Sequence, residues 1–93
     1  MKLVWTPRFT RAVKRFAKTR PGLLDDLEQT LRLLESAPHH PGLRTHKLKG
    51  DLKDCWACSA GYDFRLIFEF QKNPKTREPE THLLNVGTHD EVY

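Results

Sequence analysis

The sequence comprises 93 residues, of which 30% are charged and 38% hydrophobic, with a formal net charge of +4. Its length predicts one domain, residues 1–93, with one modest core, because a small chain buries only about two-thirds of its unfolded surface. No apolar run approaches the roughly 20 residues that span a bilayer and no signal-peptide core is present, so we expect a cytoplasmic protein without a membrane partner.

The first part of the chain predicts a short strand and a helical hairpin. An apolar strand over Leu3–Trp5 is followed by Thr6 as N-cap and Pro7 at the first position of a helix. The apolar face of this helix consists of Phe9, Ala12, Val13, Phe16 and Ala17. Pro21-Gly22 opens a second helix that ends before Pro38, with an apolar stripe of Leu24, Leu27, Leu31 and Leu34.

The rest of the chain predicts four strands. They are expected at Arg44–Lys49, Cys55–Ala60, Asp63–Phe70 and His82–Val86, with turns at Gly50-Asp51 and Gly61-Tyr62 and a polar loop over 71–80. The order β-α-α-β-β-β-β is typical of an α+β fold, with the two-helix hairpin packed on one face of a mainly antiparallel sheet.

Two motifs resemble metal or redox sites, and we interpret both as structural. Cys55 and Cys58 form a Cys-x-x-Cys, but residues three apart on a strand face opposite ways, which favours two small half-buried side chains. His39 and His40 lie in a turn without a carboxylate or cysteine cluster at ligand spacing. We therefore expect no metal site and no cofactor.

Basic residues gather in two segments, residues 1–20 and Arg44–Lys53, whereas acidic residues dominate after Asp54. This distribution indicates a polyanionic partner, with RNA or DNA ahead of membrane, or alternatively a solvated basic helix face and a charged edge strand. The candidate RNA-binding residues are Arg11, Lys14, Arg15, Lys18, Lys47, Lys49 and Lys53.

Alternation along Asp63–Phe70 places its phenylalanines on one face and Asp63 and Arg65 on the other. A guanidinium in mid-strand needs a carboxylate, such as Glu69 or a cross-strand partner, or a ligand phosphate. Residues 87–93 follow the last strand and offer His89, which can take and give a proton, and Tyr93, which can donate a hydrogen bond or stack. The alternative is that they form a frayed polar tail.

Metal-free RNA cleavage needs a base for the 2′-hydroxyl, an acid for the leaving 5′-oxygen, cations for the phosphorane and flat groups for the nucleotide. Histidine, arginine or lysine, and tyrosine supply these groups. With these residues in this order along the sequence, the chain resembles the RelE/ParE toxin superfamily and its YafQ-like branch of ribosome-dependent mRNA interferases. The resemblance rests on His46-Lys47-Leu48-Lys49-Gly50, on Asp63-Phe64-Arg65-Leu66-Ile67-Phe68, and on Gly87-Thr88-His89 with Tyr93.

The resemblance implies a toxin of a type II toxin–antitoxin system. It implies an endoribonuclease that cuts mRNA in the ribosomal A site by 2′-hydroxyl attack, leaving a 2′,3′-cyclic phosphate. The partners implied are a cognate antitoxin, the ribosome and mRNA, with an oligomeric complex on operator DNA left open. The roles implied are acid or base for His46 and His89, histidine orientation for Asp63, phosphate binding for Arg65, and base stacking or 2′-hydroxyl polarisation for Tyr93.

The sequence departs from that branch in two places, with Ser59 where a further histidine is found and Asn85 where an arginine is common. Alternation also places His46 on the face of Leu48, with Lys47 and Lys49 opposite, so either the strand is twisted or bulged there or His46 is structural. Two other functions stay open: a ParE-like DNA gyrase inhibitor, and a catalytically silent module that only binds.

Overall fold

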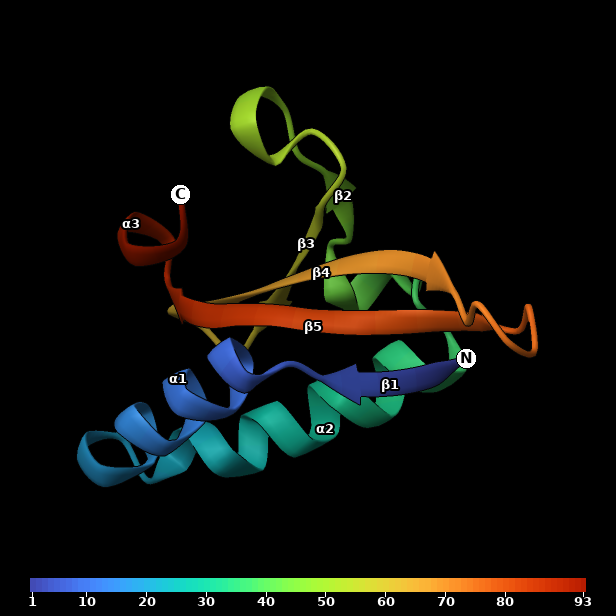
Figure 1. Ribbon diagram of the computed structural model, residues 1–93. Coiled ribbons are helices and arrows are strands. Elements are labelled where there is room, and N and C mark those ends of the chain that lie inside the picture. The colour runs from blue at the N-terminus through green and yellow to red at the C-terminus, as the bar shows by residue number, and fades with distance from the viewer.

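The computed structural model describes residues 1–93 and contains a five-stranded sheet in the order β1-β5-β4-β3-β2. Helices α1 and α2 cover one face of this sheet, and α3 lies on the other side (Figure 1). Only β1 and β5 pair in parallel, so the predicted α+β class with a mainly antiparallel sheet is confirmed. The elements are β1 (Lys2–Trp5), α1 (Pro7–Thr19), α2 (Gly22–Ser36), η1 (Pro41–Leu43), β2 (His46–Lys47), η2 (Gly50–Leu52), β3 (Trp56–Ala60), β4 (Phe64–Lys72), β5 (Pro79–Thr88) and α3 (His89–Val92).

Helix α1 begins as the sequence predicts. The Thr6 hydroxyl accepts a hydrogen bond from the backbone N–H of Phe9 at 3.3 Å and donates one to the carbonyl of Leu83 at 2.6 Å. Pro7 occupies the first helical position, where its missing N–H costs nothing. Thr6 therefore caps the helix and ties its first turn to β5.

The apolar stripe predicted for α2 is partly wrong. Leu27 and Leu34 are buried as predicted, but Leu23 takes the buried position in the first turn and Leu24 is 44% exposed. The buried face of the helix follows the spacing 23, 27, 30 and 34, with Thr30 included. Thr30 is tolerated there because its hydroxyl donates to the carbonyl of Asp26, one turn earlier, at 2.8 Å. No helix of the structure is long and apolar enough to cross a membrane.

The main core lies between the helices and the sheet, where Phe64, Leu66 and Phe68 of β4 pack against the apolar faces of α1 and α2. The opposite face of the sheet is not bare. It holds a small second cluster, the outer cluster, formed by Cys55, Ala57, Ile67, Leu48, Leu52, Leu84 and Val92.

The two cysteines belong to different clusters, Cys58 to the main core and Cys55 to the outer cluster. This arrangement confirms the prediction that they face opposite ways, but both are buried rather than half-buried as predicted. Burial raises the pKa of the Cys58 thiol to about 12, so it stays protonated and unreactive at neutral pH.

The strand predicted at Arg44–Lys49 is wrong in extent, because β2 contains only His46 and Lys47. Pro41 starts a 3-10 turn, in which the His40 ring accepts a hydrogen bond from the N–H of Gly42 at 3.0 Å. The chain then passes through Arg44 in a left-handed conformation, with φ 53°. The left-handed turn removes Arg44 from the predicted strand, and β2 ends at Lys47, before η2 begins at Gly50.

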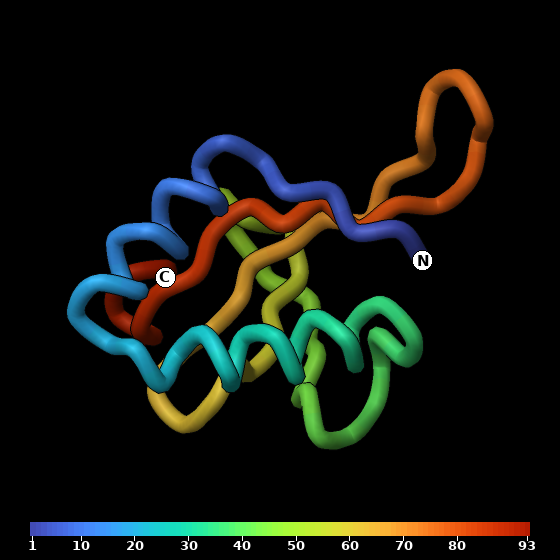
Figure 2. Tube along the Cα trace, turned by 90° about the horizontal axis from the view of Figure 1, so that it is seen from below, coloured from blue at the N-terminus to red at the C-terminus, as the bar shows by residue number.

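Strands β4 and β5 are longer than the sequence predicts, reaching Lys72 and starting at Pro79. The polar loop is shortened to residues 73–78 and projects away from the body of the molecule (Figure 2). Asn73 orders this loop, because its side-chain oxygen accepts hydrogen bonds from the N–H groups of Lys75 and Thr76 at 2.9 and 3.2 Å.

Candidate active site

Residues 89–92 fold into one helical turn, α3, beside the end of β5. The Glu91 carboxylate accepts hydrogen bonds from the Thr88 hydroxyl at 2.7 Å and from the Thr88 N–H at 3.1 Å. These bonds lower the pKa of Glu91, with a smaller contribution from the charge of Arg15. The segment is therefore a capped turn rather than a frayed tail.

Gly87 allows α3 to fold back onto the sheet. A Cβ atom at this position would lie 3.1 Å from Cγ1 of Val92 and 3.3 Å from Cβ of Glu91. The residue sits within β5, opposite Arg65 of β4, so it is the close approach of α3, and not a sharp bend, that requires glycine.

Three aromatic rings converge where α3 faces β2. The Tyr93 hydroxyl lies 3.3 Å from Nε2 of His46. The Tyr93 ring also meets the His89 ring edge to face, with centroids 4.5 Å apart and an interplanar angle of 75°. Two histidines that are 43 positions apart in the sequence thus contact one tyrosine.

The tautomer of neutral His46 follows from its partners. Nδ1 lies 2.9 Å from the carbonyl oxygen of Arg44, which can only accept a hydrogen bond. Nδ1 therefore carries the proton and Nε2 presents a lone pair, to which the Tyr93 hydroxyl donates. Burial raises the pKa of Tyr93, and the charge of Arg65 opposes this only in part, so the phenol keeps its proton at neutral pH.

These rings border a hollow of about 600 Å³, the histidine hollow. Its lining also explains the face on which His46 lies. Leu48 shares that face because it belongs to the outer cluster, and neither a bulge nor a structural role is required. Lys47 and Lys49 do not lie on one face, although alternation predicts that they would. Lys49 borders the hollow, whereas Nζ of Lys47 lies 6.0 Å from the ring centroid of Trp56. The lining residues are His46, Leu48, Lys49, Asp51, Leu52, His89 and Tyr93.

A second hollow of about 520 Å³, the arginine hollow, adjoins the first at His89, which lines both. Arg65 donates to the backbone carbonyls of Phe64 at 2.9 Å and Tyr62 at 3.4 Å, and it forms no ion pair with Glu69 or any other carboxylate. Its remaining N–H groups are free to bind an anion. The hollow is lined by Gly42, Arg44, Ser59, Gly61, Tyr62, Asp63, Arg65 and His89.

Asp63 lies in the turn before β4, exposed at the edge of this hollow. It makes no hydrogen bond to a histidine; His46 is oriented by a backbone carbonyl, and His89 has Asp90 as its carboxylate neighbour, 3.6 Å from Nδ1. Histidine orientation by Asp63 stays a prediction.

The basic face of α1 lies beside α3. Arg8, Arg11 and Arg15 line a further hollow with Asn85 and Glu91, and Arg15 approaches the Glu91 carboxylate at 3.9 Å. Lys14, Lys18 and Lys53 are exposed and belong to none of these hollows.

Sequence reasoning missed three residues of this region. Arg44 enters the arginine hollow only because the chain turns left-handed there, which no sequence pattern indicates. The sequence pattern at Tyr62 indicates only a turn. Glu91 could have been found, because a threonine followed three residues later by a glutamate is the signature of a helix start.

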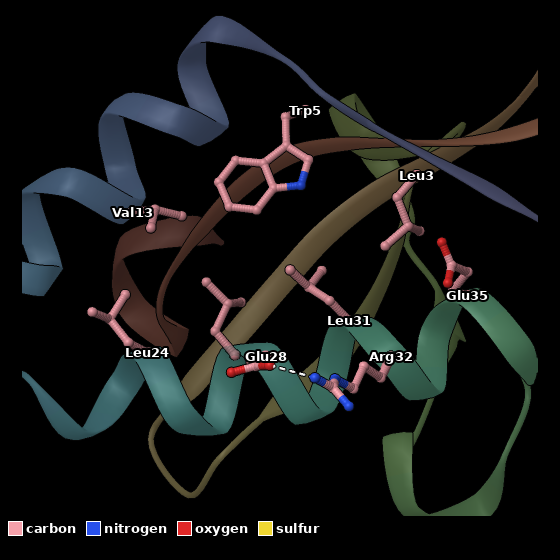
Figure 3. A pocket seen from close by; sticks show the side chains of 9 residues that line it. Leu3, Trp5, Val13, Leu24, Glu28, Leu31, Arg32 and Glu35 are labelled. Carbon is pink, nitrogen blue, oxygen red and sulfur yellow. Dashed lines mark hydrogen bonds and ion pairs between the residues drawn. The ribbon is translucent and has the colours of Figure 1, made fainter.

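One more groove lies on the helix side of the sheet, between β1, α1 and α2 (Figure 3). It is about 270 Å³ in volume and bordered by apolar side chains such as Leu3, Trp5 and Leu31, with an ion pair of 2.7 Å between Glu28 and Arg32 at its rim. Its lining contains no histidine, unlike those of the histidine hollow and the arginine hollow.

Comparison with known families decides the class of the protein. The family model described as bacterial toxin of type II toxin-antitoxin system, YafQ, matches residues 1–93. The chain belongs to the YafQ toxin family. It is thus a toxin of a type II toxin–antitoxin system, and the predicted YafQ-like family is confirmed.

Solved structures of other toxins share the fold of this YafQ-family chain. YafQ of E. coli strain BL21(DE3) is 18% identical, with a TM-score of 0.78 over 99% of this chain and 97% of the other. The YoeB/ParE toxin from Agrobacterium tumefaciens is 19% identical, with a TM-score of 0.76 over 96% and 99%. The E. coli DinJ–YafQ toxin–antitoxin complex gives 19% identity and a TM-score of 0.72 over 99% and 96%. No curated protein matches the sequence significantly.

Proposed function

We propose that this YafQ-family toxin is an endoribonuclease that cuts mRNA in the ribosomal A site by acid–base catalysis without a metal ion. The observation that carries the proposal is the convergence of His46, His89 and Tyr93 on one hollow, next to an Arg65 guanidinium that no carboxylate neutralises. Proton transfer and charge stabilisation, the two needs of RNA cleavage, are then supplied by adjacent side chains.

In the proposed reaction, one histidine takes the proton of the 2′-hydroxyl as its oxygen forms a bond to phosphorus. The bond from phosphorus to the 5′-oxygen breaks, and the other histidine gives that oxygen a proton, which leaves a 2′,3′-cyclic phosphate. The neutral tautomer of His46 leaves Nε2 as a lone pair, which suits it to the role of base once substrate displaces the Tyr93 hydroxyl.

The cations have two proposed tasks. Arg65 stabilises the charge that develops on the phosphorane, with Lys49 on the far side of His89. The basic face of α1 contacts ribosomal RNA phosphates without regard to sequence, which makes binding sensitive to salt.

An antitoxin is the proposed protein partner. The YafQ of E. coli is solved as a toxin–antitoxin complex with DinJ. We propose that this chain likewise binds a cognate antitoxin, for which the basic faces favour an acidic or amphipathic segment that folds on binding.

The decisive experiment compares the wild type with the double variant His89→Ala, Tyr93→Ala in a purified translation system, mapping mRNA ends by primer extension. Loss of one general acid or base is expected to slow cleavage by roughly 10²- to 10⁴-fold. A chelator should leave wild-type cleavage unchanged; activity that is lost in EDTA and restored by a metal would contradict the metal-free mechanism.

Two outcomes would favour the other functions. If the double variant still arrests growth fully and cuts no mRNA, the nuclease proposal is overturned. A DNA supercoiling assay with gyrase then separates a ParE-like gyrase inhibitor, which blocks supercoiling, from a module that acts only by binding.

A further inference from the structure

Tyr62 is the most exposed of the large hydrophobic residues, with 94% of its surface open to solvent. Its ring takes part in none of the aromatic pairs that pack the fold, so it contributes nothing to the core. A single exposed apolar side chain needs no special explanation. The surroundings of Tyr62 are what give it meaning.

The turn that carries Tyr62 is fixed in place. Gly61 has φ +80°, and a Cβ atom there would lie 2.6 Å from the Asp26 carboxylate of α2, so the turn lies directly against this helix. On the other side, the carbonyl of Tyr62 accepts a hydrogen bond of 3.4 Å from Arg65. The backbone is therefore held between a helix and a strand while the ring remains free.

Two arginines line the arginine hollow together with Tyr62. Arg65 belongs to β4 and Arg44 follows η1, and neither forms an ion pair with a carboxylate. Ser59, paired with Arg65 across the sheet, adds a hydroxyl, and Asp63 is the one carboxylate in the lining. A flat ring beside two fork-shaped cations matches the two parts of a nucleotide, the base and the phosphate.

We propose that the arginine hollow holds one unpaired nucleotide of the bound RNA, with its base stacked on Tyr62 and the phosphate that joins it to the cut nucleotide on Arg44 and Arg65. The inference rests on the proposed function. Because His89 lines both hollows, this nucleotide neighbours the one that is cut, and the RNA strand crosses from one hollow to the other over His89. Stacking accepts any base, so Tyr62 contributes affinity and placement more than sequence choice.

The test measures RNA binding apart from cleavage. The probe is a short single-stranded RNA with 2′-O-methyl groups, which cannot attack phosphorus, and with 2-aminopurine as a fluorescent base. It is used free and as the A-site codon of programmed ribosomes. Tyr62→Ala should weaken binding roughly 5- to 100-fold and remove the quenching of 2-aminopurine, whereas Tyr62→Phe should preserve both. The matched control, Leu24→Ala, changes a side chain in the groove on the helix side and should bind as the wild type does.

The role of Arg44 is tested by measuring how RNA affinity depends on salt concentration. Arg44→Gln should reduce the slope of log affinity against log salt concentration by about one, because one phosphate contact is lost. Thermal melts should be unchanged by Tyr62→Ala, since the ring is exposed.

Two results separate the possible failures. If wild type and Tyr62→Ala bind and quench alike, the nucleotide site is overturned while the nuclease proposal stands. If the wild type binds neither probe and cuts no mRNA, the proposed function fails and the site with it.

Discussion

The hydroxyl of Tyr93 lies 3.3 Å from Nε2 of His46, which joins α3 to β2 across 47 positions of sequence. The same ring contacts His89 edge to face. Tyr93 thus holds both histidines of the candidate site in one arrangement, and its hydroxyl and its ring have separable tasks.

Tyr93→Phe should slow cleavage about 2- to 10-fold, because the hydroxyl, once substrate displaces it from His46, can donate one modest hydrogen bond to the bound RNA. Tyr93→Ala should slow cleavage more, because the contact with His89 is lost as well. Burial raises the pKa of the Tyr93 phenol above its usual 10.0, so the hydroxyl is protonated throughout the neutral range. The ratio of wild-type to Phe-variant rates should therefore be constant from pH 6 to pH 9 in single-turnover assays. A ratio that changes across that range would show that the phenol itself transfers the proton.

Gly87→Ala should impair cleavage much more than stability. The added methyl group lies 3.1 Å from Val92 and 3.3 Å from Glu91, and α3 can relieve the overlap by moving away from the sheet. We expect at least a tenfold loss of cleavage, with a fall of less than about 2 kcal/mol in the free energy of unfolding. Gly22→Ala is the control, because a Cβ atom there meets nothing within 4 Å. Equal effects of the two substitutions would contradict the role assigned to Gly87.

Glu91 should act on the site through α3. Glu91→Ala removes the acceptor for both Thr88 donors and should reduce cleavage by loosening the turn that carries His89, while Glu91→Gln keeps an acceptor and should restore most of the rate. The loss of such a cap is worth about 1 kcal/mol.

The pH dependence of this cap follows from the sign of the shift. The folded-state pKa of Glu91 is lowered from 4.5, so the cap is fully present above pH 4.5 and weakens as the pH falls through the folded-state value. The protection of the Thr88 amide, its exchange rate compared with the intrinsic rate at the same pH, should fall in that acidic range for the wild type and not for Glu91→Gln. Unchanged protection down to pH 3 in the wild type would argue against the cap.

Glu80 should make the stability of the fold sensitive to acid. Its side chain is nearly buried and accepts hydrogen bonds from Asn73 at 3.2 Å and His82 at 3.1 Å, and the bond from Asn73 is the main reason why its pKa is lowered from 4.5. This contribution is present above pH 4.5 and is lost as the pH falls through the lowered value.

Urea titrations between pH 3 and pH 6 should therefore show a smaller pH dependence of the free energy of unfolding for Glu80→Gln than for the wild type. Cleavage at neutral pH should be nearly unchanged in this variant, because Glu80 lies outside both hollows. A variant with the acid sensitivity of the wild type would assign that sensitivity to other carboxylates.

The local elements were predictable because local signals define them. Thr6 and Pro7 predict the start of α1, and alternation along β4 correctly separates its core face from the face of Arg65. Leu24 was misplaced because the stripe of α2 is set by packing against the sheet, and leucines at 23 and 24 satisfy a helical pattern equally well.

The candidate site was predictable in its residue types and not in its contacts. His46, Arg65, His89 and Tyr93 do lie together, but the hydrogen bond that orients His46 comes from the backbone of Arg44, which has no sequence signature. The separation of Lys47 from Lys49 depends on the short length of β2, which ends before η2 begins at Gly50. Backbone geometry, rather than residue propensity, decides both of these features.

Strand β5 has a consequence for how the toxin becomes active. It is the last strand of the domain in sequence, yet it lies inside the sheet between β1 and β4, and β1 has no other strand partner. Leu3 pairs with Thr81, which is far away in the sequence. This pairing of β1 with β5 completes the sheet and is expected to be slow and late in folding. A nascent chain that lacks residues 79–88 has neither the complete sheet nor the strand β5 that precedes α3. We therefore expect the candidate site to form only after residues 79–93 have been made and have joined the sheet.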